Sequence, residues 1–291
     1  MQTILVTGAN GQLGTELQTV SGMLNPDHKI VFTDVDELDV TNRAQTLTYI
    51  RNLKPRIIIN CAAYNAVDQA ETDKETAFAI NAHAVKNLAE GSNETGCWFI
   101  HISTDYVFDG NNHVPYTEND VPRPLSAYAR SKYEGEKYAL AGAAHVLIIR
   151  TSWLYSAHGR NFVKTILHHA FSKPELRVVN DQIGTPTCAQ DLANTIVALI
   201  RGKNRIAKKE ILHFSNEGVA SWYDFAMAVV TYAQADCKII PVGTKDYPLP
   251  AIRPFYSVMN KEKIRKILGL DIPHWQNSLY QCVKEIMQSE K

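Results

Sequence analysis

TILVTGANGQLG, residues 3–14, joins an apolar strand directly to a glycine-rich loop and decides the fold. Gly8, Gly11 and Gly14 stand at G-x-x-G-x-x-G spacing, and a helical pattern begins after them. Glycine permits a tight turn and a close approach of the backbone, while a helix N-terminus offers unpaired N–H groups to phosphate. Asp34 ends the second expected strand, 20 residues after Gly14, a position suited to the hydroxyls of a ribose. The stretch therefore predicts a dinucleotide-binding loop.

Apolar runs alternate with helical segments through the first half of the chain. The runs are nearly continuous and rich in β-branched residues, which is typical of parallel strands covered on both faces. They lie at 3–8, 29–34, 56–63, 97–103 and 145–152, and the clearest helical segments between them at 41–53 and 75–91. This alternation predicts an α/β fold of Rossmann type, with a doubly wound parallel sheet.

The second half of the chain changes in character. Prolines gather at 241–254, the helical segments are longer, and strand-like pieces stand at 176–181 and 210–216. We expect a dinucleotide-binding domain over residues 1–150 and a smaller C-terminal α/β lobe, mainly for substrate binding, over 151–291. We also expect one return crossing to the main sheet near 176–200.

Composition excludes several classes of protein. Lys+Arg and Asp+Glu both number 30, so no overall charge attracts nucleic acid or an anionic membrane. No apolar run approaches the roughly 18 residues of a membrane span, and the N-terminus lacks the pattern of a signal peptide. The five cysteines form no C-x-x-C pair, which indicates reduced thiols in the cytoplasm. The ten histidines show no metal-ligand spacing, so we expect no zinc site and assign no metal ligands.

The shifted glycine spacing resembles that of the extended short-chain dehydrogenase/reductases, which implies a Tyr-x-x-x-Lys pair downstream. Tyr128 and Lys132 form this pair in LSAYARSKYEGEK, residues 125–137. At i and i+4 they share one face of the expected helix, for which Ser126 is the expected N-cap. We expect the ammonium to bring the pKa of the tyrosine toward neutrality, and Lys132 to hydrogen-bond the nicotinamide ribose.

The stretch ISTDYVFDG, residues 102–110, places small oxygen-bearing side chains at the end of an expected strand. Ligands bind at the carboxyl ends of strands in open α/β sheets. The resemblance implies that Thr104 hydrogen-bonds the carbonyl oxygen undergoing reduction. We expect Ser103 to face the cofactor or the backbone, and the following loop to shape the substrate cleft with Tyr106, Phe108 and Gly110.

Seven motifs in order extend the resemblance over nearly the whole chain. They are GANGQLG, STDYVFDG, YARSKYEGE, RTSWLY, GRNF, NDQIGTPT and RPFYSVM. Together they resemble the dTDP-4-dehydrorhamnose reductases. This resemblance implies NAD(P)H-dependent reduction of the C4 ketone of dTDP-4-dehydro-L-rhamnose to dTDP-L-rhamnose, the last step of dTDP-rhamnose biosynthesis, which serves polysaccharide biosynthesis.

The resemblance also implies which residues bind the cofactor, NADPH or NADH. The glycine loop would bind the pyrophosphate, and Asp34 would bind the adenosine ribose. The segment after Asp34 would flank the adenine, and the end of the third strand would line the nicotinamide side. In order these residues are Gly8, Gly11, Gln12, Leu13 and Gly14; Asp34; Asp39 and Val40; and Ala62, Ala63, Tyr64 and Asn65, joined by Tyr128 and Lys132. Asp34 favours NADH, because a carboxylate there repels a 2′-phosphate and no arginine stands beside it.

The substrate is implied to meet Thr104, Asp105, Tyr128 and Trp153, with Arg253 on its diphosphate. Other readings stay open. Dehydratases on this scaffold carry Thr-Asp-Glu where this chain has Thr104-Asp105-Tyr106, which leaves a nucleotide-sugar epimerase as one alternative. A non-catalytic subunit like the regulatory subunit of methionine adenosyltransferase is the other. A homodimer and a Mg²⁺ ion at a subunit contact are compatible with the resemblance, and the sequence decides neither.

Overall fold

The computed structural model describes residues 2–24, 28–202, 206–269 and 271–289. The chain forms a large and a small lobe, and a six-stranded parallel sheet is the centre of the large lobe. Its strand order is β10-β5-β4-β3-β1-β2. The strands are β1 (Gln2–Thr7), β2 (His28–Thr33), β3 (Ile57–Asn60), β4 (Trp98–Thr104), β5 (Val146–Thr151) and β10 (Lys209–His213). The predicted doubly wound parallel sheet is confirmed. The strand order reverses between β1 and β3, which is where such sheets bind ligands.

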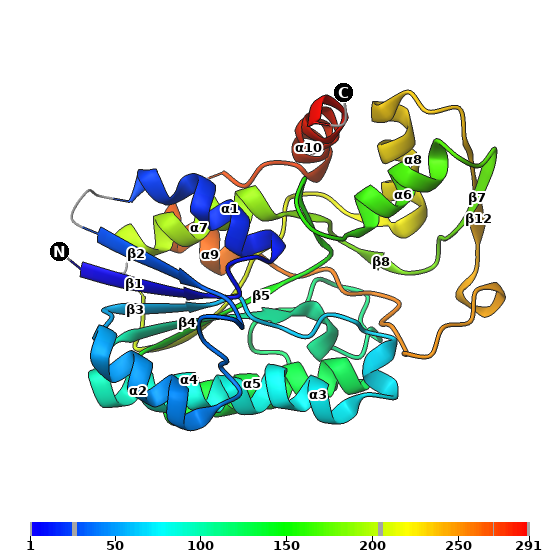
Figure 1. Ribbon diagram of the computed structural model, residues 1–291. Helices are drawn as coiled ribbons and strands as arrows, with labels where there is room; N and C mark the ends of the chain where they lie inside the picture. Colours follow the sequence, from blue (N-terminus) through cyan, green and yellow to red (C-terminus); the bar gives the residue numbers. More distant parts are fainter. Residues whose placement is uncertain (1, 25–27, 203–205, 270, 290–291) are drawn as a thin grey trace.

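Helices cover both faces of this sheet (Figure 1). One face carries α2 (Arg43–Leu53), α3 (Lys74–Phe78), α4 (Ala84–Thr95) and α5 (Ala127–Gly142), and the other carries α1 (Gln12–Val20), α7 (Ala189–Arg201) and α9 (Glu262–Leu268). Successive residues of a strand point to opposite faces, so Ile4 packs with the α1 and α7 side and Leu5 with the α2, α4 and α5 side. Both side chains are fully buried, which explains the continuous apolar runs of the sequence.

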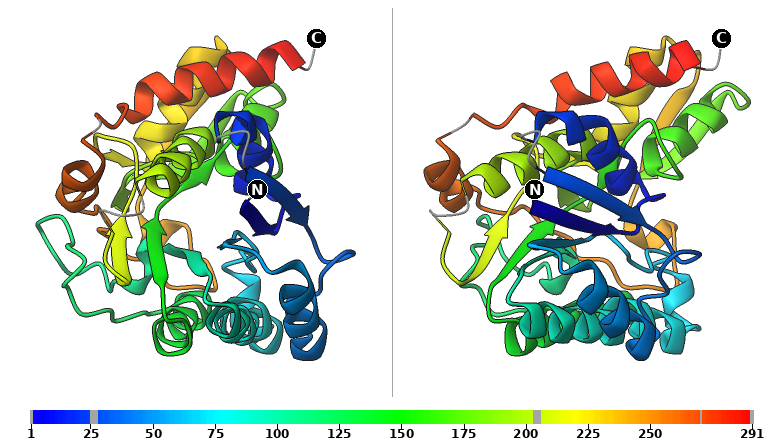
Figure 2. Two further views of the ribbon diagram at one scale, coloured as in Figure 1. Left: turned by 90° about the vertical axis from the view of Figure 1, so that its left-hand side faces the viewer. Right: turned by 60° about the vertical axis from the view of Figure 1, so that its left-hand side comes forward.

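A small lobe with its own apolar core stands beside the carboxyl edge of the sheet (Figures 1 and 2). Phe225, Val229 and Leu279 lie at the centre of this core and are fully buried. The lobe comprises β6 (Leu154–Tyr155), α6 (Phe162–Ala170), β7 (Glu175–Val179), β8 (Ile183–Gly184), β9 (Thr187–Cys188), β11 (Ala220–Ser221), α8 (Trp222–Ala233), β12 (Lys238–Val242) and α10 (Trp275–Ser289).

The chain returns from the small lobe to the large lobe through α7 and β10. The strand expected at 176–181 pairs as β7 with β12 of the small lobe, whereas α7 packs against α1 and β10 pairs with β5 of the main sheet. The C-terminal segment revisits the large lobe as well, since Ile264 of α9 joins its core. The division at residue 150 stays a prediction.

The helix expected over 75–91 is divided by a π-helical turn, Ala79–His83, between α3 and α4. The turn aims the side chain of Asn81 at the loop after β3, where it exchanges two hydrogen bonds with the backbone of Tyr64. A third hydrogen bond joins Asn81 to Ser131 of α5. Within the described residues, no helix is both long and apolar enough to traverse a lipid bilayer.

Candidate active site

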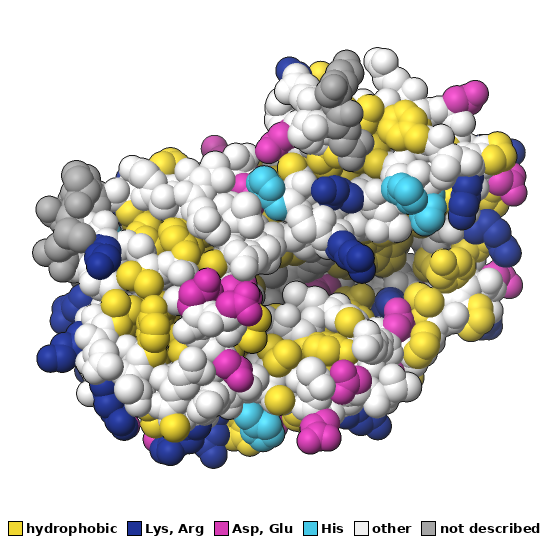
Figure 3. All heavy atoms as spheres, in the orientation of Figure 1, with side chains coloured by type: hydrophobic (Ala, Val, Ile, Leu, Met, Phe, Trp, Pro, Cys, Tyr) yellow, Lys and Arg dark blue, Asp and Glu magenta, His cyan; other side chains and the backbone are white. Residues whose placement is uncertain are grey.

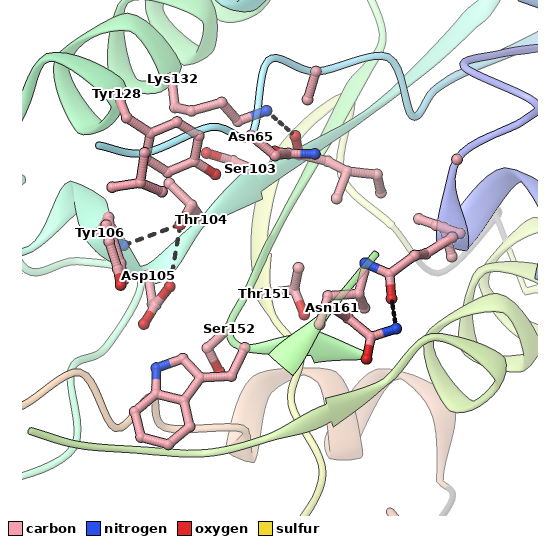
Figure 4. A pocket seen from close by; sticks show the side chains of 18 of the residues that line it. Asn65, Ser103, Thr104, Asp105, Tyr106, Tyr128, Lys132, Thr151, Ser152 and Asn161 are labelled. Carbon is pink, nitrogen blue, oxygen red and sulfur yellow. Dashed lines mark hydrogen bonds between the residues drawn. The ribbon is translucent and has the colours of Figure 1, made fainter. Parts of the chain in front are cut away.

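A cavity of about 340 Å³ lies between the carboxyl edge of the sheet and the small lobe. The molecule is hollowed between the two lobes in Figure 3, and Figure 4 shows the cavity from close by. Eleven of the sequence-predicted residues line it: Gly11, Gln12, Leu13, Gly14, Ala63, Asn65, Thr104, Asp105, Tyr128, Lys132 and Trp153. Seven others lie outside its lining: Gly8, Asp34, Asp39, Val40, Ala62, Tyr64 and Arg253.

The glycine loop is packed so closely that it excludes side chains. Gly8 has a φ of +70°, and a Cβ atom there would lie 2.5 Å from the backbone nitrogen of Ala62. At Gly14 a Cβ atom would lie 2.4 Å from the carbonyl oxygen of Gly8. Gly11 is the N-cap of α1, and no side-chain hydrogen bond caps this end of the helix. The N-terminus of α1 therefore opens toward the cavity, as a site for pyrophosphate requires.

Asp34 directly follows β2 and lies against the glycine loop. Its Oδ2 accepts a hydrogen bond from the backbone N–H of Asn10 at 2.8 Å, and its Oδ1 accepts one from Val35 at 2.9 Å. Further along, Asp39 accepts from the backbone and side chain of Thr41, and Val40 is buried. Asp34 thus flanks the glycine loop on the side away from the cavity lining, where the adenosine half of a dinucleotide would lie.

Tyr128, Lys132 and Thr104 meet in the cavity from two elements. Ser126 caps α5 by accepting from the backbone of Ala129, which confirms the predicted N-cap, and the first turns of that helix carry Tyr128 and Lys132. Thr104 is the last residue of β4. The Nζ atom of Lys132 donates to the carbonyl oxygen of Ile102 on the same strand, at 2.7 Å (Figure 4). The side chains converge at one end of the cavity.

Burial governs the ionisation of both members of the Tyr-x-x-x-Lys pair. It raises the pKa of Tyr128 to about 12, and hydrogen bonding to Thr104 only partly opposes this rise. It lowers the pKa of Lys132 to about 8, and the negative charge of Glu136 partly opposes this fall. The expectation that Lys132 brings the tyrosine toward neutrality is therefore wrong for this arrangement, because desolvation dominates and the ammonium is bound to a carbonyl oxygen. Tyr128 is instead held as a protonated phenol near neutral pH.

A buried ion pair lies directly behind these side chains. Glu136 of α5 receives two hydrogen bonds from Arg150 of β5, at 2.8 and 2.9 Å, and both side chains are at most 2% exposed. The hydroxyl of Ser103 donates to the same carboxylate at 2.5 Å. Ser103 lines the cavity, so its facing the cofactor stays a prediction, but among the described residues its hydroxyl does not bond the backbone. Its side chain instead completes the coordination of a charge that burial leaves without water.

Asp105 is a buried carboxyl group next to Thr104. Its Oδ1 accepts from the Thr104 hydroxyl at 3.1 Å, and its Oδ2 has no hydrogen-bond partner among the described residues. Burial raises the pKa of Asp105 to about 7. The cavity thus contains a carboxyl group that can be neutral or charged near physiological pH, beside the predicted reacting centre (Figure 4).

Trp153 lines the cavity from the small-lobe side in a strained conformation. Its φ of +46° is rare for a bulky residue, and its ring stacks on that of Trp222 with centroids 3.6 Å apart. Gly184 makes room for the ring, since a Cβ atom there would lie 2.7 Å from Trp153 Cε2. The packing of these three residues fixes the aromatic wall of the cavity.

Two predicted residues are engaged elsewhere. Arg253 forms a two-pronged ion pair with Asp68, at 3.0 and 2.6 Å, outside the cavity lining. Tyr64 donates from its hydroxyl to Asp73, also outside the lining. In both cases an acidic side chain binds the polar group of the predicted residue, and Asp68 is 185 residues away from Arg253 in the sequence, so no local pattern reveals that pair.

Sequence reasoning also missed residues that line the cavity. Most come from the small lobe or from strand ends: Cys61, Val67, Ile102, Thr151, Ser152, Leu154, Arg160, Asn161, Phe162 and Trp222. Of the loop residues expected to shape the substrate cleft, Tyr106 lines the cavity, whereas Phe108 and Gly110 lie outside its lining. The GRNF motif contained three of the missed residues without indicating a role. The sequence does not indicate that Trp222 lines a cavity, because an aromatic residue at the start of an apolar helix is typical of the hydrophobic core. Among the described residues, no cluster of three or more His, Cys, Asp or Glu side chains could hold a metal ion.

The carboxyl group of Asp105 makes stability depend on pH. Its pKa is raised from roughly 4 when unfolded to about 7 when folded, so the folded state binds the proton more tightly. Its contribution is therefore most favourable below about pH 4 and is lost as the pH rises to about 7. We expect wild type to lose stability relative to Asp105→Asn between about pH 5 and about pH 8, as measured by urea denaturation. Equal losses of stability in the two proteins would contradict the raised pKa of Asp105 in the folded state.

The comparisons with known proteins agree with this site. The family model described as the RmlD substrate binding domain matches residues 1–288. The dTDP-4-dehydrorhamnose reductase of Aggregatibacter actinomycetemcomitans is 39% identical over 96% of this chain and 97% of its own. That of Escherichia coli (strain K12) is 39% identical over 97% of each chain.

A solved structure extends the likeness to three dimensions. The dTDP-4-dehydrorhamnose reductase of Bacillus anthracis, determined in complex with NADP, is 39% identical and superposes with a TM-score of 0.92 over 98% of this chain and all of its own. Sequence and fold agree over nearly the full length, and the glycine loop and the Tyr-x-x-x-Lys pair stand at one cavity. The chain belongs to the dTDP-4-dehydrorhamnose reductase family.

Proposed function

We propose that this protein reduces the C4 ketone of dTDP-4-dehydro-L-rhamnose to dTDP-L-rhamnose with NADH or NADPH, as the last step of dTDP-rhamnose biosynthesis. The observation that carries the proposal is the convergence of Tyr128, Lys132 and Thr104 at one end of a cavity whose other side is the open N-terminus of α1. A proton donor and a site for a dinucleotide are the two parts that a hydride-transferring reductase needs.

The residues present fit a nicotinamide dinucleotide. The packed glycine loop and the α1 N-terminus would hold the pyrophosphate, Asp34 the adenosine ribose, Asp39 and Val40 the adenine, and the 62–65 segment with Lys132 the nicotinamide ribose side. When bound, the reduced nicotinamide supplies the hydride for the ketone carbon. The cytoplasmic location expected from the sequence belongs to the same proposal.

Residues of the chain stabilise and neutralise the negative charge that develops on the ketone oxygen. Tyr128 donates its proton to that oxygen, and its raised pKa keeps the phenol protonated near neutral pH, as a donor must be. The hydroxyl of Thr104 exchanges its hydrogen bond to Asp105 for one to the same oxygen when the sugar binds. The ammonium of Lys132 would hydrogen-bond the nicotinamide ribose, and the Trp153–Trp222 wall with Asp105 orients the sugar.

The site weighs against two of the three alternatives, and retention of the cofactor tests the third. A dehydratase needs a second acid, and Tyr106 stands where the glutamate would be. An epimerase keeps the hydride within the protein, so it would retain an oxidised cofactor through purification. A regulatory subunit does not need a buried Tyr, Lys and Thr arranged around one cavity.

Substitutions of the three proposed catalytic residues should differ in their effects on turnover and on cofactor affinity. Tyr128→Phe removes only the donor and should slow the chemical step by roughly 10²–10⁴ while cofactor binding and folding persist. Thr104→Val should slow turnover with little change in cofactor affinity, whereas Lys132→Ala should weaken both. The measurement is single-turnover oxidation of bound NADH by saturating 4-keto sugar nucleotide. A wild-type rate in Tyr128→Phe would show that another group is the acid.

Asp34 should set the choice of cofactor. A serine at this position removes a carboxylate that would repel a 2′-phosphate, so Asp34→Ser should raise kcat/KM for NADPH more than for NADH. Asp36→Ser removes the same charge from an exposed neighbouring position and should change the ratio less. An unchanged ratio in Asp34→Ser would place Asp34 away from the ribose.

A further inference from the structure

One cationic side chain of the cavity has no partner in the part of the chain that the structure describes. Among the described residues, Lys132 and Arg160 are the lysine and arginine that line it. Lys132 is buried and donates to the carbonyl oxygen of Ile102. Arg160 is exposed and makes no hydrogen bond or ion pair with any residue that the structure describes. An exposed guanidinium group that the described residues leave unpaired therefore belongs to the cavity lining.

The loop that carries Arg160 is fastened to the glycine loop of the large lobe. Asn161 donates from Nδ2 to the Oε1 atom of Gln12 at 2.9 Å (Figure 4) and to the carbonyl oxygen of Ser156 at 2.8 Å. Gly159 has a φ of +64°, and a Cβ atom there would lie 3.3 Å from the Cγ atom of Gln12. Both chain neighbours of Arg160 thus touch or face the first residue of α1. This contact holds Arg160 beside the N-terminus of the helix.

Electrostatics then indicates what Arg160 binds. Both ligands of the proposed function, a dinucleotide and a nucleotide sugar, carry a diphosphate group. The planar guanidinium group can donate two parallel hydrogen bonds to phosphate oxygens, and the α1 N-terminus adds a positive potential. The arginine that the sequence suggested for this role, Arg253, already has its two prongs on Asp68.

We infer that Arg160 binds the diphosphate group of a ligand in this cavity, the role first expected of Arg253. The inference rests on the proposed function for the identity of its ligands. The diphosphate can belong to the cofactor or to the sugar nucleotide. Both ligands would approach the place where the side chains of Gln12 and Asn161 meet. Binding experiments with each ligand alone distinguish the two sources without any need for turnover.

The test uses Arg160→Gln, which keeps a polar side chain and removes the charge, and Arg160→Lys, which keeps the charge without the planar fork. Arg201→Gln, in the last turn of α7, is the matched control for net charge. Isothermal titration gives the Kd of each full-length protein for dTDP, dTMP, NADH and NADPH. Circular dichroism checks that each variant is folded.

We expect Arg160→Gln to weaken binding of a diphosphate ligand roughly tenfold, as loss of a charge-assisted hydrogen bond predicts. Weaker binding of dTDP with NADH unchanged assigns Arg160 to the sugar nucleotide, and the reverse assigns it to the cofactor. Arg160→Lys should lose less, Arg201→Gln should bind as wild type does, and added salt should weaken wild type more than Arg160→Gln.

Unchanged Kd values for dTDP, NADH and NADPH in folded Arg160→Gln would overturn the inference and leave the proposed reductase intact. The opposite case is also distinguishable. A wild type that binds these ligands and oxidises no NADH with a 4-keto sugar nucleotide would refute the reductase, while the binding result would still decide the role of Arg160.

Discussion

The buried carboxylate of Glu136 is the constraint on which the geometry of the candidate site depends. It receives Arg150 from β5 and Ser103 from β4, two residues that pair directly across the sheet. Tyr128, Lys132 and Glu136 are spaced four residues apart, so they form one line along α5. Because Glu136 is fixed to both strands, the helix cannot slide along the sheet without breaking a buried ion pair, a change that typically costs about 3–5 kcal/mol. The distance between Tyr128 and Thr104 is set by this anchor.

The anchor also explains the electrostatic balance behind the cavity. Arg150 compensates Glu136 and stacks its guanidinium group over the Phe108 ring at 5.2 Å. The remaining field of Glu136 raises the pKa of Lys132 against the stronger effect of burial, so the lysine keeps enough affinity for its proton to act as a cation near neutral pH. The Glu136–Arg150 ion pair thus fixes the packing of α5 on the sheet and also keeps Lys132 charged.

The sequence allowed prediction of the parts of the site that local patterns encode. The strands followed from continuous apolar runs, the cofactor loop from glycine spacing, and the Tyr128–Lys132 pair from an i, i+4 interval. The rest depends on contacts between segments far apart in the chain. Gln12 meets Asn161 and Arg253 meets Asp68 over 149 and 185 residues of sequence, so the sequence around each residue does not indicate its partner. The raised pKa of Tyr128 is hidden from the sequence for the same reason, since burial is a property of the folded surroundings.

The central claim is that hydride passes from a reduced nicotinamide to C4 of a sugar nucleotide in this cavity, and isotope transfer tests it most directly. The protein is incubated with dTDP-4-dehydro-L-rhamnose and NADH deuterated at the transferred position of nicotinamide C4, and the products are analysed by mass spectrometry and NMR. The account predicts one deuterium at C4 of dTDP-L-rhamnose for each NADH oxidised. Deuterium that stays on the nicotinamide while the sugar remains a ketone, or that reaches a carbon other than C4, would contradict it.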